Sequence, residues 1–167
     1  MTETKPLDIL KGAILLEHRG KALYESVVKT SKTEAVRELF QTLTREEDKH
    51  IGILNKQFAR IARGEPCDVA ALESEHAATH EAILTEKIVE NISGAGYEAA
   101  VISAALAFEK NAVKFYSQRV AEAESESEKK LYEWLTEWEK NHMLMLSRLD
   151  NELKEKIWYD NKFWPLD

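Results

Sequence analysis

One pattern of glutamate and histidine occurs twice in the chain, and this repeat constrains the fold more than any other feature of the sequence. In each copy, a single glutamate is followed 30 positions later by Glu-x-x-His. The second copy follows the first by 92 positions, residue for residue. The repeated residues are Glu17, Glu47 and His50 in the first copy and Glu109, Glu139 and His142 in the second. A match of six residues in register indicates a structural unit that is used twice.

The spacing within each copy predicts a metal site. On a helix, the Glu and His of Glu-x-x-His lie on one face, about one turn apart. A glutamate from a partner helix can close a carboxylate and imidazole cage around a metal ion, and two such half-sites form the dimetal site of a four-helix bundle. We therefore predict that all six repeated residues bind metal. The expected roles are bridging of both ions by Glu47 and Glu139, and completion of one ion each by Glu17 with His50 and by Glu109 with His142.

Apolar and tyrosine positions repeat with the same offset, so the core is expected to repeat together with the site. The matching pairs are Ala13 and Ala105, Tyr24 and Tyr116, Leu39 and Leu131, Leu43 and Leu135, and Leu54 and Leu146. Tyr24 and Tyr116 each lie seven residues after the lone glutamate, about two helical turns along the same stripe. We predict that their hydroxyls hydrogen-bond to ligand carboxylates, with a plain core position as the alternative for Tyr116.

The composition indicates a single helical domain that binds neither nucleic acid nor membrane. The 167 residues include only 6 Gly and 3 Pro, so few helix breakers interrupt the chain. A formal net charge of -7 argues against a nucleic-acid partner. No apolar run approaches the roughly 18 residues of a membrane span, and the N-terminus lacks the apolar region of a signal peptide. We expect a cytoplasmic protein whose single cysteine, Cys67, forms no internal disulfide.

Hydrophobic periodicity and boundary signals predict two antiparallel helical hairpins joined by a long crossover. Pro6 suits a first helical turn, Ser31-Lys32-Thr33-Glu34 has the pattern of a capping box, and Arg63-Gly64 that of a helix stop. The expected bundle spans residues 1–157, with helices at about 7–30, 32–63, 97–124 and 128–157, a crossover at 64–96 that contains a short helix, and an aromatic tail at 158–167. The tail is expected either to pack on its own bundle or to dock on a second subunit of a homodimer.

The ligand and tyrosine pattern resembles that of the ferritin-like superfamily. Residues 107–116, Ala-Phe-Glu-Lys-Asn-Ala-Val-Lys-Phe-Tyr, are similar to the rubrerythrin branch in particular. The resemblance covers nearly the whole chain apart from the tail. It implies an all-α, left-handed four-helix bundle with a non-haem di-iron centre that reacts with dioxygen or hydrogen peroxide.

Two differences from rubrerythrins bear on the activity. Rubrerythrins carry a further glutamate three residues after the ligand of the third helix, used in an iron movement coupled to peroxide reduction, and this chain has Ala112 there. Rubrerythrins also carry a rubredoxin module with iron in four cysteines, and this chain has one cysteine. We therefore expect oxidation of Fe(II) by dioxygen or hydrogen peroxide, in iron handling and oxidative-stress defence. The alternatives are a peroxidase that needs an external rubredoxin-like electron donor and a non-catalytic iron-binding or sensing module.

The donor set favours two iron ions, with manganese as an alternative. Four carboxylates balance the charge of two divalent ions, and iron or manganese accepts this mixture of oxygen and nitrogen ligands better than zinc or magnesium. Zinc is expected only as a substitute in purified samples. A weaker candidate is an iron-entry site at His76 and His80, for which a solvated pair in the crossover is the favoured alternative. Nothing near Cys67 predicts a lowered thiol pKa.

Overall fold

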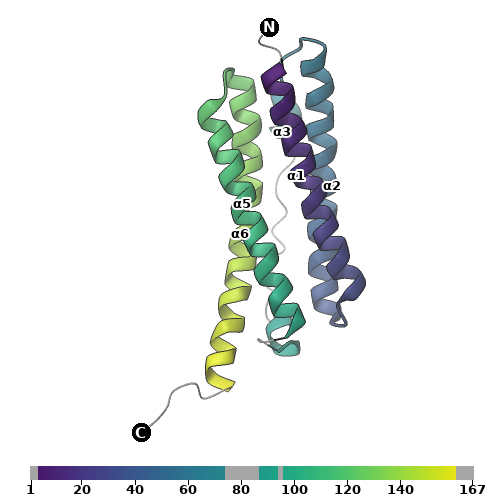
Figure 1. The fold of residues 1–167 in the computed structure, drawn as a ribbon, viewed down its shortest axis with the longest axis vertical. Coiled ribbons are helices and arrows are strands. Elements are labelled where there is room, and N and C mark those ends of the chain that lie inside the picture. Colours follow the sequence, from purple (N-terminus) through teal and green to yellow (C-terminus); the bar gives the residue numbers. More distant parts are fainter. Residues whose placement is uncertain (1–3, 74–86, 94–95, 161–167) are drawn as a thin grey trace.

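The computed structural model describes residues 4–73, 87–93 and 96–160, and these residues form helices without strands. The long helices are α1 (Thr4–Thr30), α2 (Glu34–Ala62), α5 (Tyr97–Glu122) and α6 (Glu126–Asp160), and α3 (Val69–Glu73) is short. α1 packs against α2 and α5 against α6, and the two antiparallel hairpins stand side by side (Figure 1). The predicted all-α, ferritin-like four-helix bundle is therefore confirmed.

The turn between α1 and α2 differs from the predicted capping box. α2 begins at Glu34 rather than at residue 32, and the preceding Thr33 makes no side-chain capping bond. Ser31 instead accepts a hydrogen bond from the Thr33 amide, at 3.2 Å, which is a local serine turn. Its hydroxyl also donates to Glu98 of α5, at 3.4 Å. The serine therefore closes the turn and contacts the second hairpin, and the capping-box prediction is wrong.

The end of α2 follows from the left-handed backbone of Gly64, whose φ is 76°. The Gly64 amide donates to the carbonyl of Ile61 at 2.9 Å, and the Glu65 amide donates to the carbonyl of Arg60 at 3.0 Å. These two bonds form a Schellman motif, in which glycine takes the left-handed position without a steric penalty. The chain therefore leaves α2 close to the predicted stop.

Parts of the crossover and of the tail lie outside the described residues. These parts are residues 74–86, which include His76 and His80, residues 94–95, and residues 161–167. The described part of the crossover includes α3 and a helical segment at 87–91. α6 begins two residues before the expected start, where the Glu128 amide donates to Ser125 Oγ at 3.2 Å.

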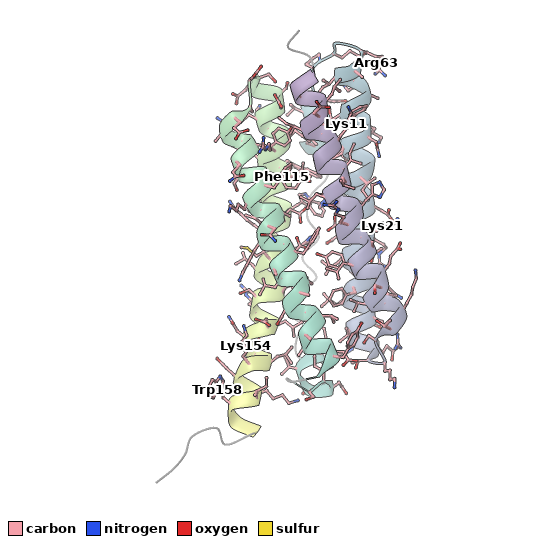
Figure 2. All side chains as sticks on the ribbon, viewed as in Figure 1. Lys11, Lys21, Arg63, Phe115, Lys154 and Trp158 are labelled. Carbon is pink, nitrogen blue, oxygen red and sulfur yellow. The ribbon has the colours of Figure 1, made fainter. Side chains whose placement is uncertain are left out.

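α6 also extends past residue 157, where the helix was expected to end. Trp158, expected in the tail, lies on its last turns and is 54% exposed (Figure 2). Among the described helices, none is long and apolar enough to cross a membrane.

Two clusters of buried apolar side chains flank a band of buried polar residues. One cluster is built around Tyr24, Phe40, Leu43, Ile102 and Leu146, and the other around Leu10, Leu54, Tyr116, Leu131 and Leu135. Along each of the four long helices, the glutamates and histidines of the repeat come between residues of one cluster and residues of the other. The core of the bundle therefore encloses the polar band at both ends.

Candidate metal centre

All six residues of the repeat lie in one buried cluster at the centre of the bundle. α1 and α5 contribute one glutamate each, and α2 and α6 contribute Glu-x-x-His each. None of the six is more than 4% exposed. Their possible ligand atoms form two groups, each within 4.8 Å: Glu17, Glu47, His50 and Glu139, and Glu47, Glu109, Glu139 and His142. Glu47 and Glu139 belong to both groups, so the two half-sites share their carboxylates.

The first half-site is built around Nδ1 of His50. This nitrogen lies 2.9 Å from Glu17 Oε2 and 3.2 Å from Glu139 Oε1, although the second contact lacks hydrogen-bond alignment. Glu47 Oε2 lies 3.8 Å away. The three carboxylates come from three different helices, so the packing of both hairpins is needed to assemble this half-site.

The second half-site is built around Nδ1 of His142. This nitrogen lies 3.4 Å from Glu109 Oε1, 3.6 Å from Glu139 Oε2 and 4.0 Å from Glu47 Oε1. The outer nitrogen, Nε2, lies 2.6 Å from a carboxylate oxygen of Glu46. Sequence reasoning missed Glu46, because its partner lies 96 residues away in the other hairpin and no local signal connects the two.

The two repeated tyrosines cross between the hairpins. Tyr24 of α1 donates its hydroxyl hydrogen bond to Glu109 of α5, and Tyr116 of α5 donates to Glu17 of α1. Burial, followed by the negative charge of the neighbouring glutamate, raises the pKa of both phenols well above 10. Each tyrosine therefore remains a hydrogen-bond donor to the lone glutamate of the opposite hairpin.

Without metal, the cluster lowers its charge by holding protons. Burial, together with the charges of Glu17 and Glu139, raises the pKa of Glu47 well above its usual range. Burial and the charge of Glu139 raise the pKa of Glu109 to about 8. Burial alone would raise the pKa of Glu139, but its close contacts with the two histidines outweigh burial and hold this pKa well below the usual range. One carboxylate therefore keeps its charge at neutral pH while two hold protons.

The two imidazoles also bind protons strongly in the metal-free cluster. Burial alone would lower the pKa of His50 and of His142, because it disfavours the charged form. Hydrogen bonds and charges from the surrounding carboxylates outweigh burial and raise both pKa values well above 6.5. A metal ion at the cluster would therefore displace protons from imidazoles as well as from carboxyls.

Unpartnered buried atoms show that a metal pair fits the cluster. Within the described residues, five of its buried polar atoms have no hydrogen-bond partner: Glu47 Oε1, His50 Nε2, Glu109 Oε2, Glu139 Oε1 and His142 Nδ1. Such atoms are rare in folded proteins and cost free energy when left alone. Four of the five belong to the carboxylates or to the site-facing nitrogen of His142. Carboxylate oxygens and imidazole nitrogens are suitable ligands for iron or manganese.

Bulky and small residues together shape the walls of the cluster. The ring of Trp138, which is 4% exposed, lies nearly perpendicular to His50 with its centroid 5.1 Å away. At Gly20, a Cβ atom would come within 2.7 Å of the Phe108 ring and 3.5 Å of the Glu47 carboxyl carbon. Only glycine therefore lets α1 approach Phe108 this closely. Ala112, three residues after Glu109, is buried in the second apolar cluster.

Two other residues, Cys67 and His18, are not part of the cluster. Cys67 is buried among residues of the second apolar cluster. Burial and the charge of Glu128 raise the pKa of its thiol to about 11, so the thiol has no thiolate character at neutral pH. His18 is exposed although it neighbours Glu17 in sequence. His76 and His80 lie outside the described residues.

Comparisons with known proteins agree with the geometry. The sequence model of the family described as Rubrerythrin matches residues 8–150. No curated protein matches the chain significantly. A solved structure of a hypothetical protein from Pyrococcus furiosus is similar in fold, with a TM-score of 0.63, 23% identity, and coverage of 90% of this chain and 91% of that one. The family match takes in all of α2 and α5, most of α1 and α6, and all six clustered residues, and the chain belongs to the rubrerythrin family.

Proposed function

We propose that this protein is a di-iron carboxylate protein that oxidises Fe(II) with dioxygen or hydrogen peroxide. The observation that carries the proposal is the pair of overlapping ligand groups that share Glu47 and Glu139. Shared carboxylates between two groups of this composition are the arrangement of di-iron sites in four-helix bundles. In this proposal, Glu47 and Glu139 bridge the ions.

The charges of the donor set support two divalent ions. Four glutamates supply four negative charges and two neutral imidazoles supply none, so two Fe(II) ions neutralise the buried cluster. When bound, the iron pair supplies two electrons to one oxidant molecule. Mn(II) satisfies the same charge balance, whereas zinc prefers fewer ligands and more nitrogen or sulfur.

The residues of the chain orient the ligands and exclude water. The hydrogen bonds from Tyr24 and Tyr116 fix the lone glutamates of opposite hairpins. The carboxyls of Glu47 and Glu109 hold protons in the metal-free state and must release them before they can bind metal. The two apolar clusters enclose the site, so electrostatic interactions there are stronger than in water.

Two observations favour Fe(II) oxidation over peroxidase turnover. Ala112 stands where rubrerythrins place a further glutamate, and it is 1% exposed in an apolar cluster. These 167 residues contain one cysteine, so a four-cysteine iron site that could reduce the centre again cannot form within them. In this proposal, turnover of the bundle uses fresh Fe(II) or a donor outside these 167 residues. Membership of the rubrerythrin family supports the second candidate, a peroxidase with an external rubredoxin-like donor.

Stopped-flow mixing tests the proposed reaction. Metal-free protein is loaded anaerobically with two Fe(II) per chain and mixed with dioxygen or with hydrogen peroxide. We expect oxidation of Fe(II) faster than in protein-free controls, and loss of this acceleration in Glu47→Ala. Efficient peroxide reduction with a rubredoxin-type donor, together with negligible Fe(II) oxidation, would establish the peroxidase instead. Binding of two irons without either reaction would establish the non-catalytic module.

A further inference from the structure

We infer that the two half-sites are unequal, and that the half-site of His142 binds metal first and more tightly because Glu46 positions its imidazole. The inference rests on the proposed dimetal centre and concerns the order in which that centre fills. It assigns roles to Glu46 and to Trp138, which occupy the same position in the two copies of the repeat.

The first observation is the contact behind His142. Its Nε2 lies 2.6 Å from Glu46 Oε2, and the Glu46 side chain is 12% exposed. A carboxylate that accepts the Nε2 proton holds that proton in place when a metal ion displaces the proton on Nδ1, so the lone pair becomes free on Nδ1. The same bond orients the ring and raises the basicity of the nitrogen that faces the metal. Nδ1 of His142 lies toward Glu109, Glu139 and Glu47, so the imidazole is prepared to bind a metal there.

The second observation is the different environment behind His50. The residue 92 positions after Glu46 is Trp138, so the first histidine faces an indole where the second faces a carboxylate. The rings of Trp138 and Trp134 lie 5.1 Å and 5.6 Å from the His50 ring, at 89° and 77° to its plane. Within the described residues, Nε2 of His50 is buried and has no hydrogen-bond partner. An aromatic ring is at best a weak acceptor, so the outer nitrogen of His50 has no partner comparable to Glu46.

The two histidines therefore differ at the Nε2 side of the ring, and this difference breaks the symmetry of the repeat. Both half-sites share Glu47 and Glu139 and have one lone glutamate and one histidine each. Each lone glutamate also accepts one tyrosine hydroxyl. The outer partner of the histidine is therefore the clearest difference between them, and loss of such a partner typically lowers metal affinity about 10- to 100-fold. The first metal ion should enter the His142 half-site, and the second should enter the His50 half-site.

Anaerobic titration of the metal-free protein with Co(II) tests this order without turnover. Calorimetry gives the two stepwise affinities, and the visible absorption of Co(II) reports its ligand environment. The variants are Glu46→Gln and, as a matched control on the same helix, the exposed Glu38→Gln. We expect Glu46→Gln to weaken the first step about 10-fold or more and to leave the second step nearly unchanged, while Glu38→Gln changes neither.

Equal half-sites give a different result in the same titration. If the half-sites were equal, Glu46→Gln would leave one intact site for the first ion, so the first step would fall at most about twofold, the statistical factor, and the second step would fall instead. That result, or equal weakening of both steps, overturns the inference. In the reverse variant, Trp138→Glu, we expect the second step to tighten because His50 gains a carboxylate partner. Absence of any Co(II) binding to the wild-type protein would overturn the proposed dimetal centre itself. Failure of the dimetal centre is therefore distinguished from failure of the inferred order of binding.

Discussion

Tyr24 of α1 donates a hydrogen bond to Glu109 of α5, across the interface between the two hairpins. Its repeat counterpart, Tyr116, makes the same contact in the opposite direction, to Glu17. Both phenols and both glutamates are fully or almost fully buried. Each hairpin therefore supplies the donor that satisfies the lone glutamate of the other. These two bonds therefore contribute both to docking of the hairpins and to orientation of the candidate ligands.

Removal of one phenol should destabilise the metal-free protein. Tyr24→Phe deletes the hydroxyl that donates to Glu109, so a buried carboxyl loses its donor, and we expect a loss of about 1–3 kcal/mol in the free energy of unfolding. Urea denaturation measures this loss in the free energy of unfolding. Tyr97→Phe is the control, because Tyr97 is 49% exposed and its hydroxyl bonds to Thr30 near the surface. Equal losses in the two variants would show that the Tyr24 bond has no special weight.

Two glycines in the long helices should respond to alanine in opposite ways. Gly20→Ala places a methyl group 2.7 Å from the Phe108 ring, so we expect a loss of about 1–3 kcal/mol through overpacking. Gly52→Ala meets no atom within 4 Å and lies in the interior of α2, so better helix propensity should stabilise it by roughly 0.5–1 kcal/mol. Thermal and urea unfolding of both variants check the signs. Stabilisation by Gly20→Ala would mean that the Phe108 ring moves away from the new methyl group without a cost in free energy.

The metal-free protein should lose stability as the pH rises through neutrality. The pKa of Glu109 is about 8 in the folded state and 4.5 without the fold, so its contribution is complete below pH 4.5 and is lost as the pH passes 8. Glu47, His50 and His142 have raised pKa values and act in the same direction. Glu139 has a lowered pKa and acts in the opposite direction, but only as the pH falls below 4.5.

Metal should reverse this dependence, because bound ions replace the protons and bind better as the pH rises. Thermal melts of the protein at about pH 6 and about pH 8, with and without Mn(II), measure both effects. Glu109→Gln cannot ionise at this position, so the metal-free variant should show a flatter profile. A metal-free protein that is equally stable at both pH values would contradict the proton-holding cluster. Identical melting temperatures with and without metal, where metal binding is also absent, would contradict the dimetal site.

The sequence was sufficient to predict the helices and the composition of the cluster, because both depend on regular spacing. The 3.6-residue periodicity placed the apolar stripes, and the offset of 92 placed Glu17 and Glu109 on corresponding helices. Regular spacing in the sequence does not predict contacts that form only when the two hairpins pack together. Glu46 looks like one more charge in the run Glu46-Glu47-Asp48-Lys49, and only the docked hairpins bring it to His142. The need for Gly20 likewise follows from where the Phe108 ring lies.

The ends of the helices show a second limit of the sequence. The pattern Ser-x-x-Glu occurs at Ser31 and again at Ser125, but the two serines bond differently. Ser125 accepts from the amide three residues later and caps α6, whereas Ser31 accepts from the amide two residues later. A serine can satisfy either amide, so the local pattern alone does not decide between a cap and a turn.

The shared carboxylate should affect both metal ions, and a histidine only one. Glu47 belongs to both ligand groups, whereas His50 belongs to one. Glu47→Ala should therefore reduce metal retention at both positions, and His50→Ala mainly at one. The metal content per chain after dialysis distinguishes the effect of Glu47→Ala from that of His50→Ala. Loss of metal in the same proportion from the two variants would show that Glu47 does not bridge.

Substitution of Ala112 tests whether a small residue at this position directs the reaction. Ala112 is 1% exposed among apolar side chains, one turn beyond Glu109, so Ala112→Glu buries a further carboxyl beside the cluster. Without metal we expect a loss of several kcal/mol in stability, and with Fe(II) part of this loss should be recovered if the added carboxylate reaches an ion. The exposed Ala104 on the same helix provides the control Ala104→Glu, which should be nearly neutral.

The kinetics of Ala112→Glu separate the two candidate reactions, Fe(II) oxidation and peroxide reduction. A fifth carboxylate beside one iron makes the two ligand shells unequal in charge, so the coupled oxidation of both Fe(II) ions by dioxygen should slow, while peroxide reduction with an added rubredoxin-type donor should gain. Stopped-flow and steady-state assays of Ala112→Glu against Ala104→Glu measure both. Unchanged Fe(II) oxidation in an Ala112→Glu protein that still binds two irons would show that residue 112 does not set the reaction. The proposed preference for Fe(II) oxidation would then rest only on the single cysteine of these 167 residues.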